Sequence, residues 1–293
     1  MDFDLQFRHS GNMESIVAAH AFSTLGHPGR LAVFRLLMRF APQGVRPTEM
    51  TAALGFRPNT LSHHLSDLAA ANLIRVERRG RSLYYTVALD AAEELIGYLA
   101  LDVARARPDL LGPLHAARRE LGNLNGNVHV LFLCSANSAR SIFAEVLLRD
   151  LGKGRFRVDS AGTRPAVAVN PLTLRTLAQR GHDTAGLRSK HISDFRGPGA
   201  RAFDVVVTVC DTAAAEECPP WPGGPITGHW GVPDPALATG TEDDRAQVFD
   251  RTYEILRRRI NAFVDLPFDG MSATALQRHV DALGSHHLSL QKG

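Results

Sequence analysis

Residues 128–141 read VHVLFLCSANSARS, and this stretch decides the fold of the C-terminal half of the chain. The apolar run 128–133 has the composition of a buried strand, and it ends at Cys134. Five small residues follow, and then Arg140 and Ser141 open an amphipathic helical pattern. A loop between a strand and a helix N-terminus turns its backbone N–H groups inward. The stretch therefore predicts a cradle for a tetrahedral oxyanion.

The chemistry of the cradle is expected to come from its first and last residues. The planar guanidinium of Arg140 suits two oxygens of the anion. The positive field of the loop should lower the pKa of the Cys134 thiol, so that a thiolate attacks the central atom of the anion. The alternative without catalysis is a buried cysteine at a strand end with a surface arginine nearby. The remaining residues of the predicted oxyanion-binding loop are Ser135, Ala136, Asn137, Ser138, Ala139 and Ser141.

The stretch resembles the low-molecular-weight protein tyrosine phosphatase fold and the arsenate reductases built on it. Their signature is C-x5-R-S with an asparagine three residues after the cysteine, and Cys134, Asn137, Arg140 and Ser141 occupy those positions. The resemblance implies that Asn137 shapes the loop and that Ser141 hydrogen-bonds the thiolate. From residue 128 onward, strand and helix patterns alternate, which indicates an α/β domain with a parallel sheet covered by helices.

Two further candidates, Cys210 and Asp234, lie where strands are expected to end. Ligands bind at the carboxyl ends of strands in open parallel sheets, so both side chains can meet Cys134 at one edge. The pair Asp234-Pro235 resembles the Asp-Pro of the phosphatase fold, in which the aspartate protonates the leaving oxygen. The structural alternative for Asp234 is a capping or turn aspartate before proline.

Cys210 and Cys218 separate a reductase from a phosphatase, which needs one cysteine. The segments VVTVC, CPPWP and HWGVPDPA resemble the thioredoxin-coupled arsenate reductases. The resemblance implies that Cys134 attacks arsenate, that Cys210 displaces arsenite, and that Cys218 takes over the disulfide. No bound cofactor is expected, and the external reductant is thioredoxin or a low-molecular-weight thiol.

The sequence departs from that family in two places. The spacing of eight between Cys210 and Cys218 is one longer than in the family, and Ala139 stands where the family loop often has a cysteine. Two alternatives to a Cys210–Cys218 disulfide therefore stay open. Cys218 can be incidental, or the cycle can end in a small-molecule thiol. Residues 162–171 contain no aromatic side chain, which disfavours a phosphotyrosine pocket. The leading interpretation is an arsenate reductase with possible residual phosphatase activity.

The N-terminal part predicts a winged helix-turn-helix. Helices are expected at residues 13–25, 29–40, 48–54, 59–71 and 89–105, with Thr48 as a cap, and strands at 73–76 and 83–87. The second short helix would read DNA, and the arginine-rich hairpin tip would contact phosphates. The predicted DNA-binding residues are Arg57, Asn59, Thr60, Ser62, His63, Arg78, Arg79 and Arg81.

Residues 15–100 resemble the arsenic-responsive (ArsR-type) repressors in the segments TLGHPGRLAVFRLL and NTLSHHLSDLAAANLIRVERRGRSLYYTV. The resemblance implies binding to double-stranded DNA as a homodimer whose first and last helices pair. Many members bind arsenite through a cysteine pair in the first helix of the helix-turn-helix, but residues 45–53 contain no cysteine. His63 and His64 are expected to face DNA or the hydrophobic seam, so no metal site is predicted.

Length and composition agree with two domains. The 293 residues fit about two domains of ordinary size. No apolar run of 18 residues is present, so no membrane span is expected, and the charged N-terminus is not expected to be a secretory signal. Three cysteines fit a cytoplasmic protein without a disulfide framework. The expected parts are a winged-helix domain (1–107), a linker (108–127), a phosphatase-like reductase domain (128–270) and a tail (271–293). Two alternatives remain: a regulator with a phosphatase domain, and a non-catalytic repressor that senses through its thiols.

Overall fold

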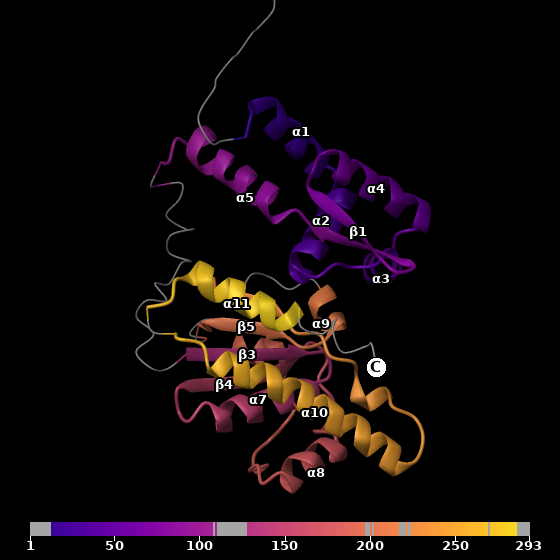
Figure 1. The fold of residues 1–293 in the computed structure, drawn as a ribbon, viewed down its shortest axis with the longest axis vertical. Helices are drawn as coiled ribbons and strands as arrows, with labels where there is room; N and C mark the ends of the chain where they lie inside the picture. The colour runs from indigo at the N-terminus through magenta and orange to yellow at the C-terminus, as the bar shows by residue number, and fades with distance from the viewer. Residues whose placement is uncertain are drawn as a thin grey trace, which may run out of the picture. The chain divides into compact units, whose positions relative to one another are not determined.

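The computed structural model describes residues 13–107, 109, 128–196, 200, 202–216, 221, 224–268 and 270–285. The chain divides into two compact units, residues 1–115 and 116–293 (Figure 1). The expected linker lies outside the described residues, apart from Asp109. Within the described ranges no helix is long and apolar enough to cross a membrane.

The first unit is a winged helix-turn-helix, as predicted. Strands β1 and β2 pair antiparallel, with Ile74 opposite Val87 and Arg79 opposite Ser82. Gly80 has a φ of +61° in the turn between them, a conformation that glycine adopts without strain. The elements are α1 (Ser15–Leu25), α2 (Pro28–Phe40), α3 (Pro47–Leu54), α4 (Pro58–Ala70), β1 (Ile74–Arg79), β2 (Ser82–Val87), α5 (Leu89–Gly97) and the π-helix η1 (Tyr98–Val103).

Proline explains where three of these helices begin. Pro28, Pro47 and Pro58 are each the first residue of a helix, one residue earlier than expected. Proline fits this position because the first N–H of a helix needs no intrahelical partner. The prediction that Thr48 caps α3 was wrong. The carboxylate of Glu49 instead accepts a hydrogen bond of 2.7 Å from the backbone N–H of Arg46.

Helix α4, which the sequence predicts to read DNA, is fixed by an apolar face and by one arginine. Leu61, Leu65 and Leu68 are buried on the face that the sequence predicts. Arg30 of α2 donates to Asp67 of α4 at 3.0 Å and to the carbonyl of Thr24 at 2.6 Å. The exposed face of α4 is therefore held in a defined orientation on its own unit.

The second unit contains a four-stranded parallel sheet in the order β4-β3-β5-β6, which confirms the predicted fold class. Its elements are β3 (Val128–Cys134), α7 (Arg140–Leu151), β4 (Phe156–Gly162), α8 (Pro171–Gln179), the 3-10 helix η3 (Ile192–Phe195), β5 (Val205–Thr208), α9 (Asp211–Ala215), β6 (Ile226–His229), the 3-10 helix η4 (Pro235–Leu237), α10 (Glu242–Val264) and α11 (Ala273–Ser285).

Alternating residues of β3 build two cores. Val130 and Phe132 lie in the larger cluster, with the buried side chains of α7, α10 and α11. Leu131 and Leu133 lie in the smaller cluster on the opposite face, with Phe203. Because both faces are covered, β3 reads as a continuous apolar run, and its end delivers Cys134 to the edge of the sheet.

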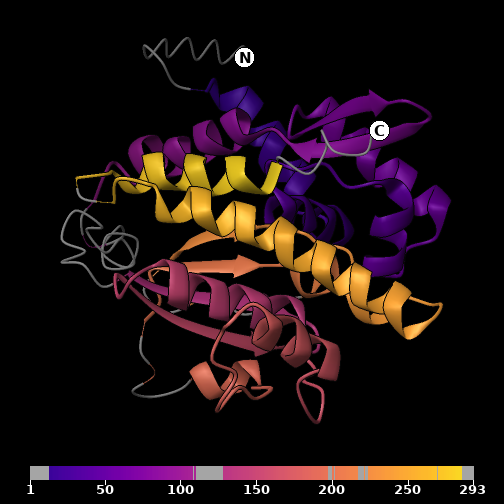
Figure 2. The ribbon, with the colours of Figure 1, turned by 60° about the horizontal axis from the view of Figure 1, so that its bottom comes forward.

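The segment expected to be a tail contributes to the core. Leu276, Val280 and Leu283 of α11 recur at helical spacing and are buried in the larger cluster. Helix α11 packs on β6 and beside α10 (Figure 2). The second unit therefore extends to Ser285 at least.

Candidate active site

The loop after β3 wraps around the sulfur of Cys134. Its carbonyls accept hydrogen bonds from outside the loop, from Thr163 N to Cys134 O, Arg164 N to Ser135 O, Ala166 N to Ala136 O, Ser189 Oγ to Asn137 O and Asn170 N to Ser138 O. A carbonyl and the next N–H point in opposite directions across a planar trans peptide. The loop N–H groups therefore face inward, and that of Asn137 donates to Cys134 Sγ at 3.1 Å.

Asn137 gives the loop its shape. Its φ is +46°, in the left-handed region that asparagine tolerates better than most residues. Its Nδ2 donates to Ser141 Oγ at 2.8 Å and to Ser160 Oγ at 2.7 Å, and its Oδ1 accepts from the backbone N–H of Lys190 at 2.7 Å. Three segments of the chain thus hold one buried side chain.

Ser141 lies at hydrogen-bond distance from the sulfur, with 3.0 Å between its Oγ and Cys134 Sγ. Burial raises the pKa of the Cys134 thiol, and the nearby Cys210 raises it further. The hydrogen bond from Ser141 and the charge of Arg140 lower this pKa but do not reverse the direction. The expectation of a lowered pKa was therefore wrong, because a buried thiolate loses its hydration.

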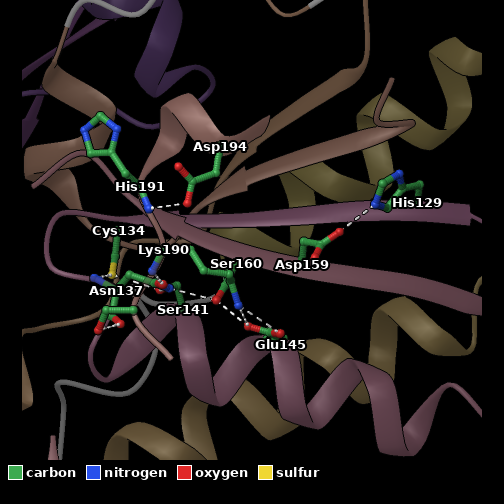
Figure 3. A network of polar contacts seen from close by, with 11 residues as sticks. His129, Cys134, Asn137, Ser141, Glu145, Asp159, Ser160, Lys190, His191 and Asp194 are labelled. Carbon is green, nitrogen blue, oxygen red and sulfur yellow. Dashed lines mark hydrogen bonds and ion pairs between the residues drawn. The ribbon is translucent and has the colours of Figure 1, made fainter. Parts of the chain in front are cut away.

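A polar network that the sequence did not predict continues from the loop (Figure 3). Ser160 donates a short hydrogen bond to the carboxylate of Glu145. Lys190 Nζ lies 2.9 Å from the same carboxylate, and both side chains are almost buried. The sequence held one signal, because Glu145 stands four residues after Ser141, on the same face of α7 and among apolar neighbours.

Arg140 and Asp234 meet at the mouth of the loop. Arg140 Nη2 donates to Asp234 Oδ2 at 2.6 Å, and its Nη1 donates to the carbonyl of Val232 at 3.3 Å. Asp234 Oδ1 also accepts from Ala236 N at 3.1 Å, so this aspartate caps a turn as well. Asp234 is therefore a capping residue, and the same side chain also contacts Arg140.

The second cysteine lies beside the first. Strands β3 and β5 are neighbours, with Leu133 opposite Thr208, and Cys210 follows β5 at the same edge as Cys134. Cys210 Sγ lies 3.4 Å from Ser135 Oγ in the loop after β3, and both described cysteines are free thiols. Cys218 lies outside the described residues.

The predicted DNA-binding residues fall into two groups. Arg57, Asn59, Thr60, Ser62 and His63 are exposed at the start of α4. On the hairpin, Arg78 and Arg81 are exposed, and no described carboxylate pairs with either of them.

The third hairpin arginine and the second histidine of α4 are engaged within the unit. Arg79 pairs with Glu77 at 2.6 Å and stacks on the ring of Tyr84. His64 is buried against His27 and Phe56, and burial lowers its pKa. Across the described ranges, no three His, Cys, Asp or Glu side chains are grouped to hold a metal ion.

A family model described as low molecular weight phosphotyrosine protein phosphatase matches residues 129–281, just over half of the chain. The chain belongs to the low molecular weight phosphotyrosine protein phosphatase family. A model described as a helix-turn-helix domain matches residues 25–77 of this family member. The chain therefore joins a helix-turn-helix domain to a phosphatase-family domain.

Several relatives of this phosphatase-family domain are named arsenate reductases. The arsenate reductase of Bacillus licheniformis is 34% identical over 137 residues, which are 46% of this chain and 94% of that protein. That of Bacillus subtilis is 34% identical over 140 residues, 47% of this chain and 96% of the relative. The solved arsenate reductase from Archaeoglobus fulgidus is 28% identical and covers 47% of this chain and 99% of its own, with a TM-score of 0.38.

Proposed function

We propose that the chain is a two-domain arsenic-resistance protein in which a DNA-binding transcriptional regulator is fused to an arsenate reductase. The observation that carries this proposal is the place of Cys210, whose sulfur lies 3.4 Å from Ser135 Oγ beside Cys134. Hydrolysis of a phosphate ester in such a loop needs one thiolate, whereas reduction of arsenate needs two thiols. Relatives named arsenate reductases match the second unit over almost their whole length.

The first step uses the loop, Arg140 and Asp234. Cys134 attacks arsenic(V) in its thiolate form, which the hydrogen bond from Ser141 and the charge of Arg140 favour against burial. The inward N–H groups and the guanidinium of Arg140 bind the oxygens. A guanidinium has five N–H donors, so its contacts with Asp234 and Val232 leave others for the anion. Asp234 gives a proton to the departing oxygen, which leaves as water, and a bond between Cys134 and arsenic remains.

The second step uses Cys210. Its thiolate attacks Cys134 Sγ, and the electron pair of the sulfur–arsenic bond passes to arsenic, which leaves as arsenite. The two electrons gained by arsenic come from the two thiols, which become the Cys134–Cys210 disulfide. Cys218 then attacks Cys210 and frees Cys134. An external thiol, either thioredoxin or a low-molecular-weight thiol, reduces the remaining disulfide.

The deciding experiment offers arsenate and p-nitrophenyl phosphate to the purified full chain, with thioredoxin or with small thiols as reductant. Arsenite and phosphate are measured separately. Arsenite release that depends on the reductant supports the proposal. Phosphate release without arsenite, at any reductant concentration, contradicts it and indicates a regulator with a phosphatase domain.

The first unit is proposed to bind double-stranded DNA as a homodimer in the cytoplasm. The start of α4 and the tip of the hairpin present exposed polar and basic side chains, which suit base edges and phosphates. Large apolar side chains are exposed on α1 and on the α5–η1 segment, namely Ile16, Val17, Ile96, Leu99, Leu101 and Val103. Pairing of these first and last helices between two copies would bury them. Sedimentation of Ile96→Glu against the wild type tests the dimer, because a buried charge there should give monomers.

A further inference from the structure

One buried histidine holds both flanks of the turn that carries Cys210. His229 Nδ1 lies 2.9 Å from Thr208 Oγ1, and His229 Nε2 lies 3.1 Å from Asp211 Oδ1. Thr208 is the last residue of β5, and Asp211 is the first residue of α9. Cys210 lies between them, so the imidazole bridges the strand and the helix on either side of the cysteine.

We propose that His229 is a positioning residue for Cys210. It clamps the turn between β5 and α9 so that the thiol of Cys210 faces the oxyanion loop. This inference rests on the proposed function, because only a reductase requires Cys210 to reach the sulfur of Cys134. In this role His229 acts through the turn that carries Cys210 and not on the substrate.

The position of His229 is fixed because the backbone around it is hydrogen-bonded to several other segments. His229 is 6% exposed and pairs with Thr208 in the ladder between β5 and β6. The next residue, Trp230, donates its backbone N–H to the carbonyl of Thr208 at 2.8 Å. Its indole Nε1 donates to the carbonyl of Val280 on α11 at 2.9 Å.

A buried arginine fixes the turn that follows the histidine. Arg259 of α10 donates from Nη1 to the carbonyl of Trp230 at 2.7 Å and to that of Gly231 at 3.3 Å. Burial lowers the pKa of Arg259 to about 10, which leaves it a cation at neutral pH. The guanidinium thus anchors the turn to the longest helix of the unit.

Gly231 shows how closely the turn after His229 packs on the contact between His229 and Asp211. A Cβ at this position would lie 2.6 Å from Asp211 Oδ1 and 2.8 Å from His229 Nε2. A side chain at this position would have to push Asp211 and His229 aside, so the turn at Gly231 packs directly against both of them. His229 is therefore held by the buried side of the contact, whereas its partner Asp211 has a side chain that is 75% exposed.

The clamp matters because the contacts of Cys210 itself are weak. Its Sγ accepts from Ala213 N at 3.4 Å and lies 3.4 Å from Ser135 Oγ, and a thiol is only a weak hydrogen-bonding group. The cysteine also stands at the start of a five-residue helix. Helices this short have little stability of their own. Loss of the histidine should therefore let the turn relax, and an error of about 1 Å in a nucleophile's position can cost on the order of 100-fold in rate.

The test compares three substitutions of one side chain. His229→Ala removes both contacts, His229→Asn keeps an amide near the position of Nδ1, and His229→Gln reaches toward the position of Nε2. We expect His229→Ala to lower reductant-dependent arsenite release by on the order of 100-fold, with p-nitrophenyl phosphate hydrolysis within about twofold of wild type. The Gln variant, which can still hold Asp211, should recover more arsenite release than the Asn variant.

A second readout does not depend on the substrate. In a Cys134→Ser/Cys218→Ser background, the rate at which iodoacetamide labels Cys210 reports how well the turn is held. Cys210 is 1% exposed, so labelling should be slow, and His229→Ala should accelerate it about tenfold or more. His182→Ala is the matched control, because His182 is another largely buried histidine that contacts a carboxylate, Asp150, and it should leave the labelling rate unchanged.

The outcomes separate the clamp from the reductase. If the wild type releases no arsenite, the proposed function fails, and the labelling rates alone decide whether His229 holds the turn. Equal labelling of wild type and His229→Ala overturns the inference. The inference is also overturned if His229→Ala lowers both activities equally and His182→Ala accelerates the labelling of Cys210 as much as His229→Ala does. In that case His229 only stabilises the fold.

Discussion

Arg140 Nη2 lies 2.6 Å from Asp234 Oδ2, although 93 residues separate the two in the chain. The side chain proposed to bind the oxyanion and the one proposed to protonate the leaving oxygen therefore hold each other at the edge of the sheet. This pair ties the loop after β3 to the turn before η4, so a substitution at Asp234 changes the chemistry and the electrostatic setting of Arg140 together.

Asp234→Asn should separate these two effects. Asparagine keeps an acceptor for Arg140 but carries no transferable proton, so turnover of p-nitrophenyl phosphate should fall by about 100-fold or more. The affinity for inorganic phosphate as a competitive inhibitor should not fall, because Arg140 and the loop stay in place and one negative charge beside the anion is removed. Asp159→Asn, on the neighbouring β4 and paired with His129, is the control and should retain activity. Full turnover by Asp234→Asn would show that another group supplies the proton.

Cys210→Ser should separate arsenite release from hydrolysis of phosphate esters, the two activities proposed for the second unit. Attack on a phosphate ester needs Cys134, Arg140 and Asp234, so hydrolysis of p-nitrophenyl phosphate should stay near that of the wild type. Arsenite release should fall to below about a hundredth, because a serine hydroxyl stays protonated and cannot form the disulfide. Mass spectrometry should find the protein with arsenic on Cys134. A joint loss of both activities would assign Cys210 a structural role.

Ser141→Ala should raise the pKa of Cys134 further. The hydrogen bond from Ser141 lowers this pKa against the effect of burial, so its removal favours the protonated thiol. The thiolate exists above the pKa, and the pH at which iodoacetamide labels Cys134 half-maximally should therefore move upward. Ser62→Ala in the first unit is the control. A midpoint that stays the same or moves downward would show that Ser141 does not stabilise the thiolate.

Much of this site follows from local sequence, and the rest depends on contacts that no local pattern contains. The apolar run of β3, the small residues after Cys134 and the helix pattern from Arg140 predict the cradle and the sheet edge. The roles of Lys190 and Glu145 are set by contacts across 45 positions of the chain, which periodicity cannot reveal. The direction of the Cys134 pKa depends on complete burial, which the sequence indicates only as an apolar run.

Lys190→Met should destabilise the second unit. The Lys190 and Glu145 side chains are 10% and 13% exposed, so the change leaves a buried carboxylate without its cation at a cost of about 3–5 kcal/mol. Both tryptophans, Trp221 and Trp230, belong to this unit, so fluorescence during urea unfolding reports its transition alone. Adding Glu145→Gln should recover part of the loss. If Lys190→Met alone keeps wild-type stability, water already screens the Lys190–Glu145 pair.

The three arginines of the hairpin should differ in their effect on DNA binding. Arg78 and Arg81 are exposed, whereas Arg79 pairs with Glu77 and stacks on Tyr84. A side chain already engaged within the hairpin releases fewer counterions from DNA than a free one. Arg78→Ala/Arg81→Ala should therefore reduce the slope of log affinity against log salt by about 1.8, or 0.9 for each lost phosphate contact, on every DNA sequence. Arg79→Ala should change the slope by less than about 0.45, which is half the value for one phosphate contact. Fluorescence anisotropy from 50 to 300 mM salt measures the slopes of the wild type, the double variant and Arg79→Ala. If Arg79→Ala lowers the slope as much as the loss of one exposed arginine, DNA draws Arg79 away from Glu77.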